Sequence, residues 1–396
     1  MINLKTSSIL VYMMATHSIP SNILDIVNAT NLLKVKSVVS HNSKIQYNIV
    51  SYNKDTLVAD TTSTYGKYRS VILNGAGAVV GFAPSKSIAA ETFMAARPVV
   101  NENLVAEEFV EGTMLNVFFN AGVWEVATKQ TIGANVRFYT NNVDTFFTMF
   151  LDAMQNTGLT FDMLDKKNSY SFVLQHPKNR IVVSFEKPAL YLIAVYEITF
   201  VEQTNTYDIA KVDVLPKLAL HVKIPAKYDD WETYSDLTQK YASPTTPYQC
   251  LGVMIHDRLT GERCKIRNPA YEHVRKLRGN QPKLQYHYLC LRKEGNVAEF
   301  LLYYPEHKKA FSNYRTQLHA LTHDIFQHYI QCYMKKEKPL IEFPPQYRPH
   351  MFNLHKLYVD ELKAQQKYVT KAVVIDYMNG LHPSQQLYWL NYARTG

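Results

Sequence analysis

Cysteine is scarce in this sequence, and no long apolar run is present. The 396 residues include four cysteines, Cys250, Cys264, Cys290 and Cys332, and no Cys-x-x-Cys pair. This spacing argues against a disulfide framework or a cysteine-rich zinc module, and we expect a reducing, intracellular (cytoplasmic) compartment. No apolar stretch reaches the roughly 18 residues that a membrane-spanning helix needs, so we expect no membrane partner. Residues 1–23 lack a compact apolar segment behind a basic start, which predicts no secretory signal.

Glycine-rich phosphate loops are also missing. The segment Gly75-Ala76-Gly77 has neither a following Gly-Lys-Ser/Thr nor the spacing of a dinucleotide fingerprint. It stands between two expected strands, and we therefore predict a hairpin turn. Ser85, His176 and Asp144 have no nucleophile-elbow context, which argues against a hydrolase.

The composition is that of a globular protein whose positive charge is unevenly distributed. Hydrophobic residues make up 46% and charged residues 19%, and the length suits two domains. Residues 1–262 carry 22 Lys and Arg against 24 Asp and Glu, whereas residues 263–396 carry 21 against 10. A basic third on a near-neutral body predicts a polyanionic partner, and nucleic acid is favoured. The alternative is a helical domain that is basic without binding function.

The pattern of apolar residues predicts an α+β fold. Short β-branched and aromatic runs between about residues 34 and 200 predict strands, and residues 144–156 have helical spacing. After about residue 304 the pattern becomes helical, with helices expected at residues 308–338, 351–379 and 383–392. We therefore predict an antiparallel-sheet domain over residues 1–304 and a helical C-terminal domain over residues 305–396.

Four segments, in order, resemble one protein family. They are residues 68–72, 108–113, 170–182 and 252–271, and the third, YSFVLQHPKNRIV, is the most specific. Together they resemble the RNA ligases of the phage tRNA-repair type, within the covalent nucleotidyltransferase superfamily. The similarity runs from about residue 50 to residue 275. It implies a ligase-type nucleotidyltransferase domain and a partner that is RNA, such as broken RNA ends or a tRNA-like structure. Family members are often viral, which makes a viral source plausible.

The resemblance also implies a chemistry. In such ligases a lysine amine attacks the α-phosphate of ATP and forms a lysyl–AMP intermediate, which is covalent catalysis. Carboxylates hold the divalent metal, and lysines neutralise the charge that develops on the phosphate. If this activity is retained, the cofactors are ATP and Mg²⁺.

This sequence departs from the family at the catalytic positions. Phe109 stands where the nucleophilic lysine is expected, and no lysine lies between Arg97 and Lys129. At the two positions where metal-facing glutamates are expected, the sequence has Ser171 and Leu251. We therefore expect no catalytic residues and no metal site. For Phe109 we expect burial in the core, with stacking on a base as the alternative.

The phosphate-facing positions are kept. The family's nucleotide- and phosphate-binding positions correspond to Arg69, Glu111, Gly112, Lys129, Lys265 and Arg267. Losing two carboxylates while keeping these cations leaves a pocket that attracts phosphate but holds Mg²⁺ poorly.

A basic, tyrosine-containing stretch follows the last motif. Residues 263–293 contain nine Lys and Arg and one acidic residue, interleaved with Tyr271, Tyr286 and Tyr288. Basic groups with aromatic faces suit single-stranded RNA, and a solvated basic surface is the alternative. We expect RNA binding by Arg275, Lys276 and Arg278, because a turn at Gly279-Asn280 would expose them.

Three histidines fall on one expected helix. His319 and His323 share a face at a spacing of four residues, and His328 follows. No third ligand accompanies them, so we favour solvated or RNA-facing histidines over a zinc site.

Three functions stay open at this stage. The first is a degenerate RNA-ligase-like protein that binds RNA ends or a nucleotide. The second is an active ATP-dependent RNA ligase whose nucleophile is displaced. The third is a structural scaffold protein that keeps only the fold, and that is a virion component if the source is viral.

Overall fold

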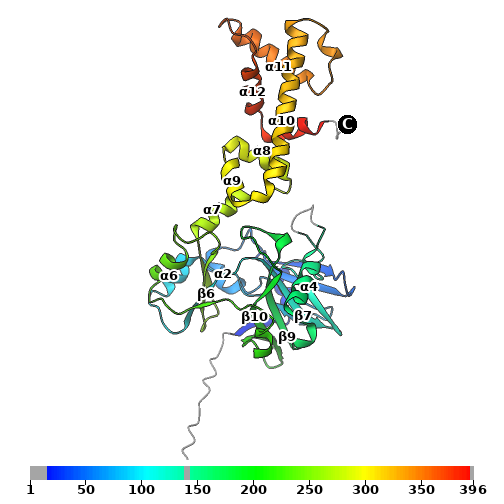
Figure 1. The fold of residues 1–396 in the computed structure, drawn as a ribbon. Helices are drawn as coiled ribbons and strands as arrows, with labels where there is room; N and C mark the ends of the chain where they lie inside the picture. The colour runs from blue at the N-terminus through cyan, green and yellow to red at the C-terminus, as the bar shows by residue number, and fades with distance from the viewer. Residues whose placement is uncertain (1–15, 138–142, 393–396) are drawn as a thin grey trace, which may run out of the picture. The chain divides into compact units, whose positions relative to one another are not determined.

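The computed structural model describes residues 16–137 and 143–392, and the chain divides into two compact units. Unit 1 ends at Arg275, and unit 2 begins at Lys276. Unit 1 contains the sheets and unit 2 is helical (Figure 1), which confirms the α+β class. The sequence predicted the change to helix after residue 304, but helices already begin at Pro269. The division into an RNA-ligase-like domain and a C-terminal domain at residues 304 and 305 stays a prediction.

Unit 1 is built from three antiparallel sheets. The six-stranded sheet has the order β1-β11-β10-β9-β7-β8. Its strands are β1 (Thr16–Pro20), β7 (Thr113–Asn120), β8 (Val123–Ala127), β9 (Asn168–Gln175), β10 (Ala189–Val201) and β11 (Thr206–Val212). The second sheet has the order β12-β6-β13-β14. It comprises β6 (Leu104–Glu108), β12 (Lys227–Tyr228), β13 (Gly252–Asp257) and β14 (Arg263–Arg267).

The third sheet carries the expected hairpin. Its order is β2-β3-β4-β5, with strands β2 (Leu33–Val39), β3 (Gln46–Tyr52), β4 (Val71–Leu73) and β5 (Val79–Phe82). The N–H of Asn74 donates to the carbonyl of Ala78 at 3.0 Å, and Gly77 has a φ of 83°. This confirms the hairpin turn at residues 75–77, because a positive φ favours glycine. The helices of unit 1 are α1 (Ile23–Ala29), α2 (Ala59–Tyr65), α3 (Ala90–Ala96), α4 (Phe146–Thr157), α5 (Pro216–Ala219), α6 (Tyr234–Tyr241) and most of α7 (Pro269–Arg278).

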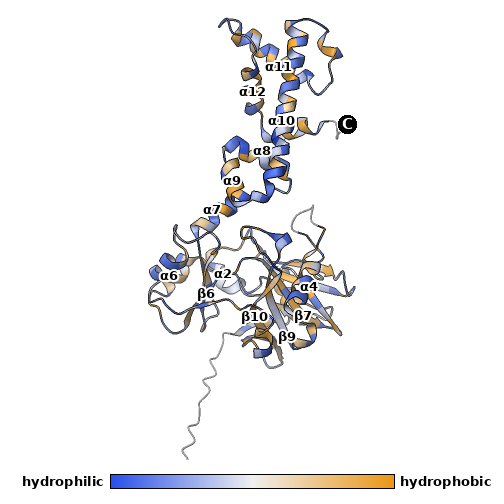
Figure 2. Ribbon diagram, in the orientation of Figure 1, coloured by the Kyte–Doolittle hydropathy of each residue, from blue (hydrophilic) through white to orange (hydrophobic). Residues whose placement is uncertain are grey.

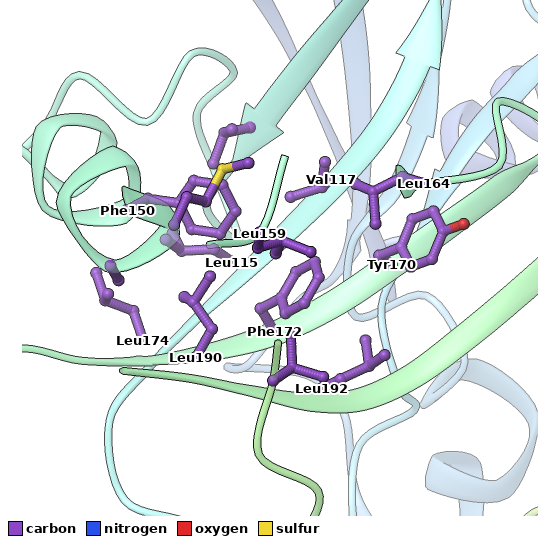
Figure 3. Packing of buried hydrophobic residues seen from close by; sticks show 14 of the residues in the cluster. Leu115, Val117, Phe150, Leu159, Leu164, Tyr170, Phe172, Leu174, Leu190 and Leu192 are labelled. Atoms are coloured by element: carbon purple, nitrogen blue, oxygen red, sulfur yellow. The ribbon is translucent and has the colours of Figure 1, made fainter. Parts of the chain in front are cut away.

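The main core lies between the six-stranded sheet and α4. Thr145 caps this helix through its side-chain oxygen, which accepts the N–H of Thr148 at 3.2 Å, and Gly158 ends it with a φ of 70°. Figure 3 shows Phe150 of α4 close to Leu115 and Phe172 of the sheet, all fully buried. Burial of such side chains stabilises each by about 1.5–3 kcal/mol relative to exposure.

Alternate side chains of β9 point to opposite faces of the sheet, and only one of these faces packs in this core. Tyr170, Phe172 and Leu174 belong to this core. Because successive side chains of a strand point to opposite faces, Ser171 and Val173 face the other side of the sheet. That side carries the candidate site described below.

Unit 2 is a set of packed helices. They are α8 (Leu284–Glu294), α9 (Val297–Tyr303), α10 (Lys308–Tyr329), α11 (Arg348–Leu357), α12 (Lys371–Gly380) and α13 (Pro383–Leu390). Figure 2 shows both hydrophobic and hydrophilic residues along α10. Leu318, Leu321 and Ile325 are buried there, at helical spacing. The π-helical turns η4 (Ile330–Met334) and η6 (Tyr358–Leu362) extend α10 and α11.

The single helix predicted over residues 351–379 is wrong. The chain leaves the helix after η6, and Gln366 has a φ of 55°. Thr370 then begins α12 by accepting the N–H of Val373 with its side-chain oxygen at 3.4 Å. No glycine or proline marks this break in the sequence, which is why periodicity alone missed it.

Across the residues that the structure describes, no helix has both the length and the apolarity that a bilayer crossing requires.

Candidate functional site

One cavity of unit 1 lies where the six-stranded sheet meets the sheet that contains β6, β13 and β14. It encloses about 500 Å³, which is within the range of small-molecule sites. Its lining includes Arg69, Phe109, Gly112 and Lys265, four positions that the resemblance singled out. These residues come from three of the four motif segments, so the fold brings together parts of the chain that are almost 200 residues apart in sequence.

Positive side chains dominate the polar lining. Arg69, Lys86, Arg263 and Lys265 line the cavity. The buried guanidinium of Arg263 donates from Nε to the carbonyl of Ser85 at 2.7 Å, which holds it in the wall. Burial and the neighbouring Arg69 lower the pKa of Arg263 to about 10.

Lys265 is the most strongly perturbed lysine of this lining. Burial lowers its pKa to about 8, and the surrounding Arg267, Arg69, Arg263 and Lys86 add to the effect because like charges disfavour protonation. β14 pairs with β13, where Lys265 stands opposite Met254. Lys265 is therefore positioned by the pairing of the edge strand β14 with β13 rather than by a flexible loop.

Lys129 stands beside the cavity rather than in its lining. Its ammonium lies 4.3 Å from the centre of the Tyr52 ring, and Tyr52 does line the cavity. Burial lowers the pKa of Lys129 to about 8, with further contributions from Lys54 and Arg69. The backbone at Lys129 is held by Ser70, whose hydroxyl donates to the Lys129 carbonyl at 3.3 Å.

Phe109 is a lining residue and not part of the core. The sequence favoured burial, but the ring is half-buried and faces the cavity. Phe109 follows the last residue of β6, and its N–H donates to the carbonyl of Gly252 at 3.3 Å. The guanidinium of Arg267 lies 5.6 Å from its ring centre. The prediction of core burial failed because the strand ends one residue earlier, at the cavity edge.

Two motif glycines are explained by backbone packing. Gly112 has a φ of 145°, and a Cβ there would lie 2.4 Å from the carbonyl oxygen of Leu174. Gly252 has a φ of 128°, and a Cβ would lie 2.1 Å from the carbonyl oxygen of Ile266. Both positions exclude side chains, so these glycines are retained for close strand approach and need no catalytic reason.

The two positions where metal-facing glutamates were expected hold side chains that are buried in the protein. Ser171 is fully buried, and its hydroxyl donates to Asn116 Oδ1 at 2.9 Å. Leu251 is buried at 7% exposure. Neither residue lines the cavity, whose apolar floor includes Met114, Val173, Ile193 and Met254.

Two carboxylates in the lining were missed by the sequence analysis. Glu107 and Glu108 end β6, directly before Phe109. Oε1 of Glu107 lies 2.7 Å from Nε2 of His256. Burial opposes ionisation of Glu107, but His256 and nearby cations outweigh it and lower its pKa. The available signal was that Glu107 directly precedes the second motif segment and that Glu108 is its first residue.

Glu111 lies outside the lining of the cavity. Its carboxylate accepts the backbone N–H of Val182 at 2.8 Å and that of Val183 at 3.1 Å. Burial nevertheless raises its pKa to about 7. Two backbone amides that follow the family-specific Pro-x-Asn-Arg segment therefore hold the carboxylate of Glu111, which precedes β7. A contact between Glu111 and a ligand stays a prediction.

The expected RNA-binding residues around Gly279 differ in availability. Arg275 donates from Nε to Glu272 at 3.0 Å, and Glu272 also forms an ion pair with Arg267. Lys276 is exposed, whereas Arg278 is buried at 9% exposure, contrary to the expected exposure. The stretch is helical, so Arg278 falls on the buried side of α7 together with Val274 and Leu277.

The tyrosines of the same stretch are mostly unavailable for stacking. Tyr271 and Tyr288 are each 3% exposed, and only Tyr286 is half-buried. The ring of Tyr288 packs on Phe311 with 5.0 Å between centres. These residues lie on α7 and α8 rather than on strands, and helix packing buries two of the three rings.

The three histidines lie on α10 as expected, but only two of them are exposed to solvent. His319 and His323 are exposed, and His328 packs on Tyr347 with 4.6 Å between ring centres. Within residues 16–137 and 143–392, no group of three or more His, Cys, Asp or Glu side chains is arranged to hold a metal ion.

No protein-family model and no curated protein matches the sequence. Solved structures similar to the chain include a Naegleria gruberi RNA ligase variant with ATP and Mn, an archaeal ATP-dependent RNA ligase, and the Naegleria gruberi RNA ligase with PPi. The identities are 12%, 12% and 13%, and the TM-scores are 0.31, 0.35 and 0.35. The matches cover 44%, 75% and 61% of this chain and 51%, 71% and 77% of the others, so the first spans about half of that ligase. The proposals below therefore depend on the geometry of this chain.

Proposed function

We propose that this chain is a catalytically degenerate RNA-ligase-like protein that binds a nucleotide or an RNA end in the cavity of unit 1. The observation that carries the proposal is the convergence of Arg69, Phe109 and Lys265 on one cavity of about 500 Å³. A cationic wall beside an aromatic ring and an apolar floor matches a ligand with phosphates and a planar base.

Degeneracy follows from the side chains at the reacting positions. Phe109 has no nucleophilic atom, and Ser171 and Leu251 are buried away from the lining. The side chains expected to bind phosphate are thus present, whereas those at the family's catalytic positions are replaced.

Nucleotide binding by the purified full chain tests the proposal. We expect ATP to bind, measured by isothermal titration calorimetry, and Lys265→Gln to weaken binding about tenfold, which corresponds to about 1.4 kcal/mol. The matched control is Lys217→Gln, an exposed lysine on α5 outside the cavity lining. Equal affinities for both variants would contradict the placement, and failure of the parent to bind ATP, AMP or 5′-phosphorylated RNA would leave the scaffold function.

One observation favours the second function, an active ligase. Lys265 lines the cavity, and its pKa of about 8 leaves a fraction of the amine uncharged at neutral pH. As a displaced nucleophile its Nζ would attack the α-phosphorus of ATP. An N–P bond would form, pyrophosphate would leave, and the amine would lose its proton to solvent.

Labelling with α-³²P-ATP in Mg²⁺ or Mn²⁺ separates these two functions. The degenerate protein gives no label that survives denaturation. Label mapped to Lys265 by mass spectrometry, and lost in Lys265→Arg, would establish the active ligase instead.

For RNA we propose a surface of unit 2 in place of the stretch near Gly279, where Arg278 is buried and Arg275 is paired with Glu272. Residues 276–396 carry 17 Lys and Arg against 9 Asp and Glu. Four rings form what we call the aromatic column: Tyr333, His355, Tyr358 and Tyr368. Tyr333 and His355 stack with 3.9 Å between centres, and Tyr358 and Tyr368 with 6.5 Å.

Exposed charge accompanies the aromatic column. Tyr368 is 66% exposed, and the exposed residues Lys356, Lys363 and Lys367 are close in sequence to its rings. η4 and η6 hold two of the rings, and π-helical turns are frequent at functional sites. Aromatic faces beside lysines suit single-stranded RNA.

Salt-dependent RNA binding tests this surface. Fluorescence anisotropy with a single-stranded oligonucleotide should show Tyr368→Ala weakening binding, and Lys356→Gln with Lys363→Gln flattening the log–log salt slope by about 0.7 per lost phosphate contact. The matched control is Lys308→Gln with Lys309→Gln, an exposed pair at the start of α10. A larger loss from Arg275→Gln with Lys276→Gln would restore the placement near Gly279.

A further inference from the structure

The resemblance implies a divalent metal beside the nucleotide phosphates, and the side chains of the cavity do not fit one. A Mg²⁺ site in such enzymes needs carboxylate oxygens that are free to coordinate the ion or its waters. Ser171 and Leu251 supply none, and the floor of the cavity is apolar. Only the lining residues Glu107 and Glu108 could substitute for them within the described cavity.

The carboxylate of Glu107 is already engaged by another side chain of the protein. One oxygen lies 2.7 Å from His256 Nε2, and Lys211 and Arg263 are close enough to contribute to its lowered pKa. A metal ion there would compete with a histidine and two fixed cations. The position therefore favours a structural ion pair in the cavity wall.

The carboxylate of Glu108 is also engaged, more weakly. Its Oε2 accepts the backbone N–H of Ala226 at 3.3 Å, and its Oε1 accepts the hydroxyl of Tyr191 at 3.5 Å. One partly engaged carboxylate is a poor ligand set for Mg²⁺, which needs near-octahedral oxygen coordination.

The positive side chains of the cavity can neutralise the phosphate charge that a divalent metal neutralises in the family. Arg69, Lys86, Arg263 and Lys265 line the cavity, and their positive charges act on a bound phosphate, with Lys265 mostly protonated at pH 7. We infer that this cavity binds the phosphates of a nucleotide without a divalent cation, and that Mg²⁺ weakens this binding. The inference rests on the proposed nucleotide-binding function and specifies the ionic form of the ligand.

The physical reason for the Mg²⁺ effect is charge. Free ATP carries more negative charge than its Mg²⁺ complex, so a cationic cavity attracts it more strongly. A bound Mg²⁺ would also be brought close to Lys265 and Arg69, while the lining carboxylates Glu107 and Glu108 are already engaged by other partners.

Calorimetric titration of the full chain with ATP, in EDTA and in excess Mg²⁺ at equal ionic strength, tests the inference. We expect saturable binding in EDTA and about three- to tenfold weaker binding in Mg²⁺. Equal or tighter binding in Mg²⁺ would overturn the inference and leave nucleotide binding intact. Absence of binding in both buffers would overturn the proposed function itself, so the two failures are distinguishable.

Two variants and a metal probe sharpen the test. Glu108→Gln removes the one partly engaged carboxylate, and we expect ATP binding in EDTA to be unchanged or up to about threefold tighter. A metal ligand at this position would instead give a variant that loses affinity only in Mg²⁺. As a direct probe, the electron paramagnetic resonance signal of free Mn²⁺ should stay undiminished when ATP-free protein is added, with Glu102→Gln, at an exposed position outside the cavity lining, as the matched charge control. Loss of that signal in the parent but not in Glu108→Gln would contradict the inference.

Discussion

The guanidinium of Arg267 lies 5.6 Å from the centre of the Phe109 ring. In the family that the sequence resembles, these two positions hold a phosphate-facing cation and the nucleophilic lysine. Here the first cation rests beside an aromatic ring and is also paired with Glu272. Under the proposed function this pair forms part of a binding surface, since cation–π contacts stabilise without transferring any group.

Phe109→Lys alone should not restore ligation. The new amine would lie at the cavity edge, but Ser171 and Leu251 still leave the metal without carboxylates. Adenylylation with α-labelled ATP, followed by a denaturing gel, measures this outcome. Strand joining by the single variant would show that the two carboxylates are dispensable.

Phe109→Ala should weaken nucleotide binding. Base stacking on an aromatic side chain is worth about 1–3 kcal/mol, so we expect a loss of about five- to 150-fold in affinity. Phe109→Tyr keeps the ring and serves as the control, with affinity close to that of the parent. Equal loss in both variants would mean that the ring does not stack on the ligand.

Nucleotide affinity should fall between pH 7 and pH 9. Lys265 faces Arg267, Arg69, Arg263 and Lys86, and its pKa of about 8 means that it loses its proton in this range, as does Lys129. Phosphates are already ionised above pH 7, so the protein governs the change. We expect about tenfold weaker binding at pH 9. The double variant Lys265→Arg with Lys129→Arg keeps both charges and should flatten the profile, and an unchanged profile would assign the titration to other groups.

Glu111 should make the protein less stable as pH rises from 4.5 to 7. Its pKa is raised from 4.5 to about 7 by burial, opposed by the N–H groups of Val182 and Val183 and by Arg180. In this window the folded state keeps a proton that the unfolded chain has lost, so the free energy of unfolding declines with pH by up to roughly 3 kcal/mol.

Urea unfolding at pH 5.5 and pH 8 measures the effect of Glu111. Glu111→Gln keeps an acceptor oxygen without a titrating proton, and should be at least as stable as the parent at pH 8. Glu102→Gln, at an exposed position, is the control and should leave the pH dependence as it is. A decline that survives Glu111→Gln would place its origin elsewhere.

Gly112→Ala should destabilise unit 1. At a φ of 145° an alanine is strained, and its Cβ would meet the Leu174 carbonyl at 2.4 Å. The backbone strain alone costs about 1–3 kcal/mol. Thermal unfolding followed by circular dichroism measures the loss. Gly75→Ala, where a Cβ would meet nothing within 4 Å, is the control and should change the midpoint little.

Much of the fold could be predicted from local patterns of apolar residues. Alternation in β9 and helical spacing in α4 were readable because one face of each is fully apolar. The helical segment after Pro269 was missed because basic residues and tyrosines interrupt its apolar pattern. There α7 is capped by Asn268, whose Oδ1 accepts the N–H of Ala270 at 2.9 Å.

The sequence alone determined the α+β class, the presence of a phenylalanine at position 109 and the basic character of the C-terminal third. These depend on residue identity and on local periodicity, which do not require contacts between distant segments. Only the tertiary structure decided which charges share a cavity and which are turned away. Lys265 faces the cavity because β14 pairs with β13, while Glu111 is held by the amides of Val182 and Val183 and Arg278 is buried. Such outcomes follow from strand register and helix packing between segments far apart in the chain, and no local pattern encodes them.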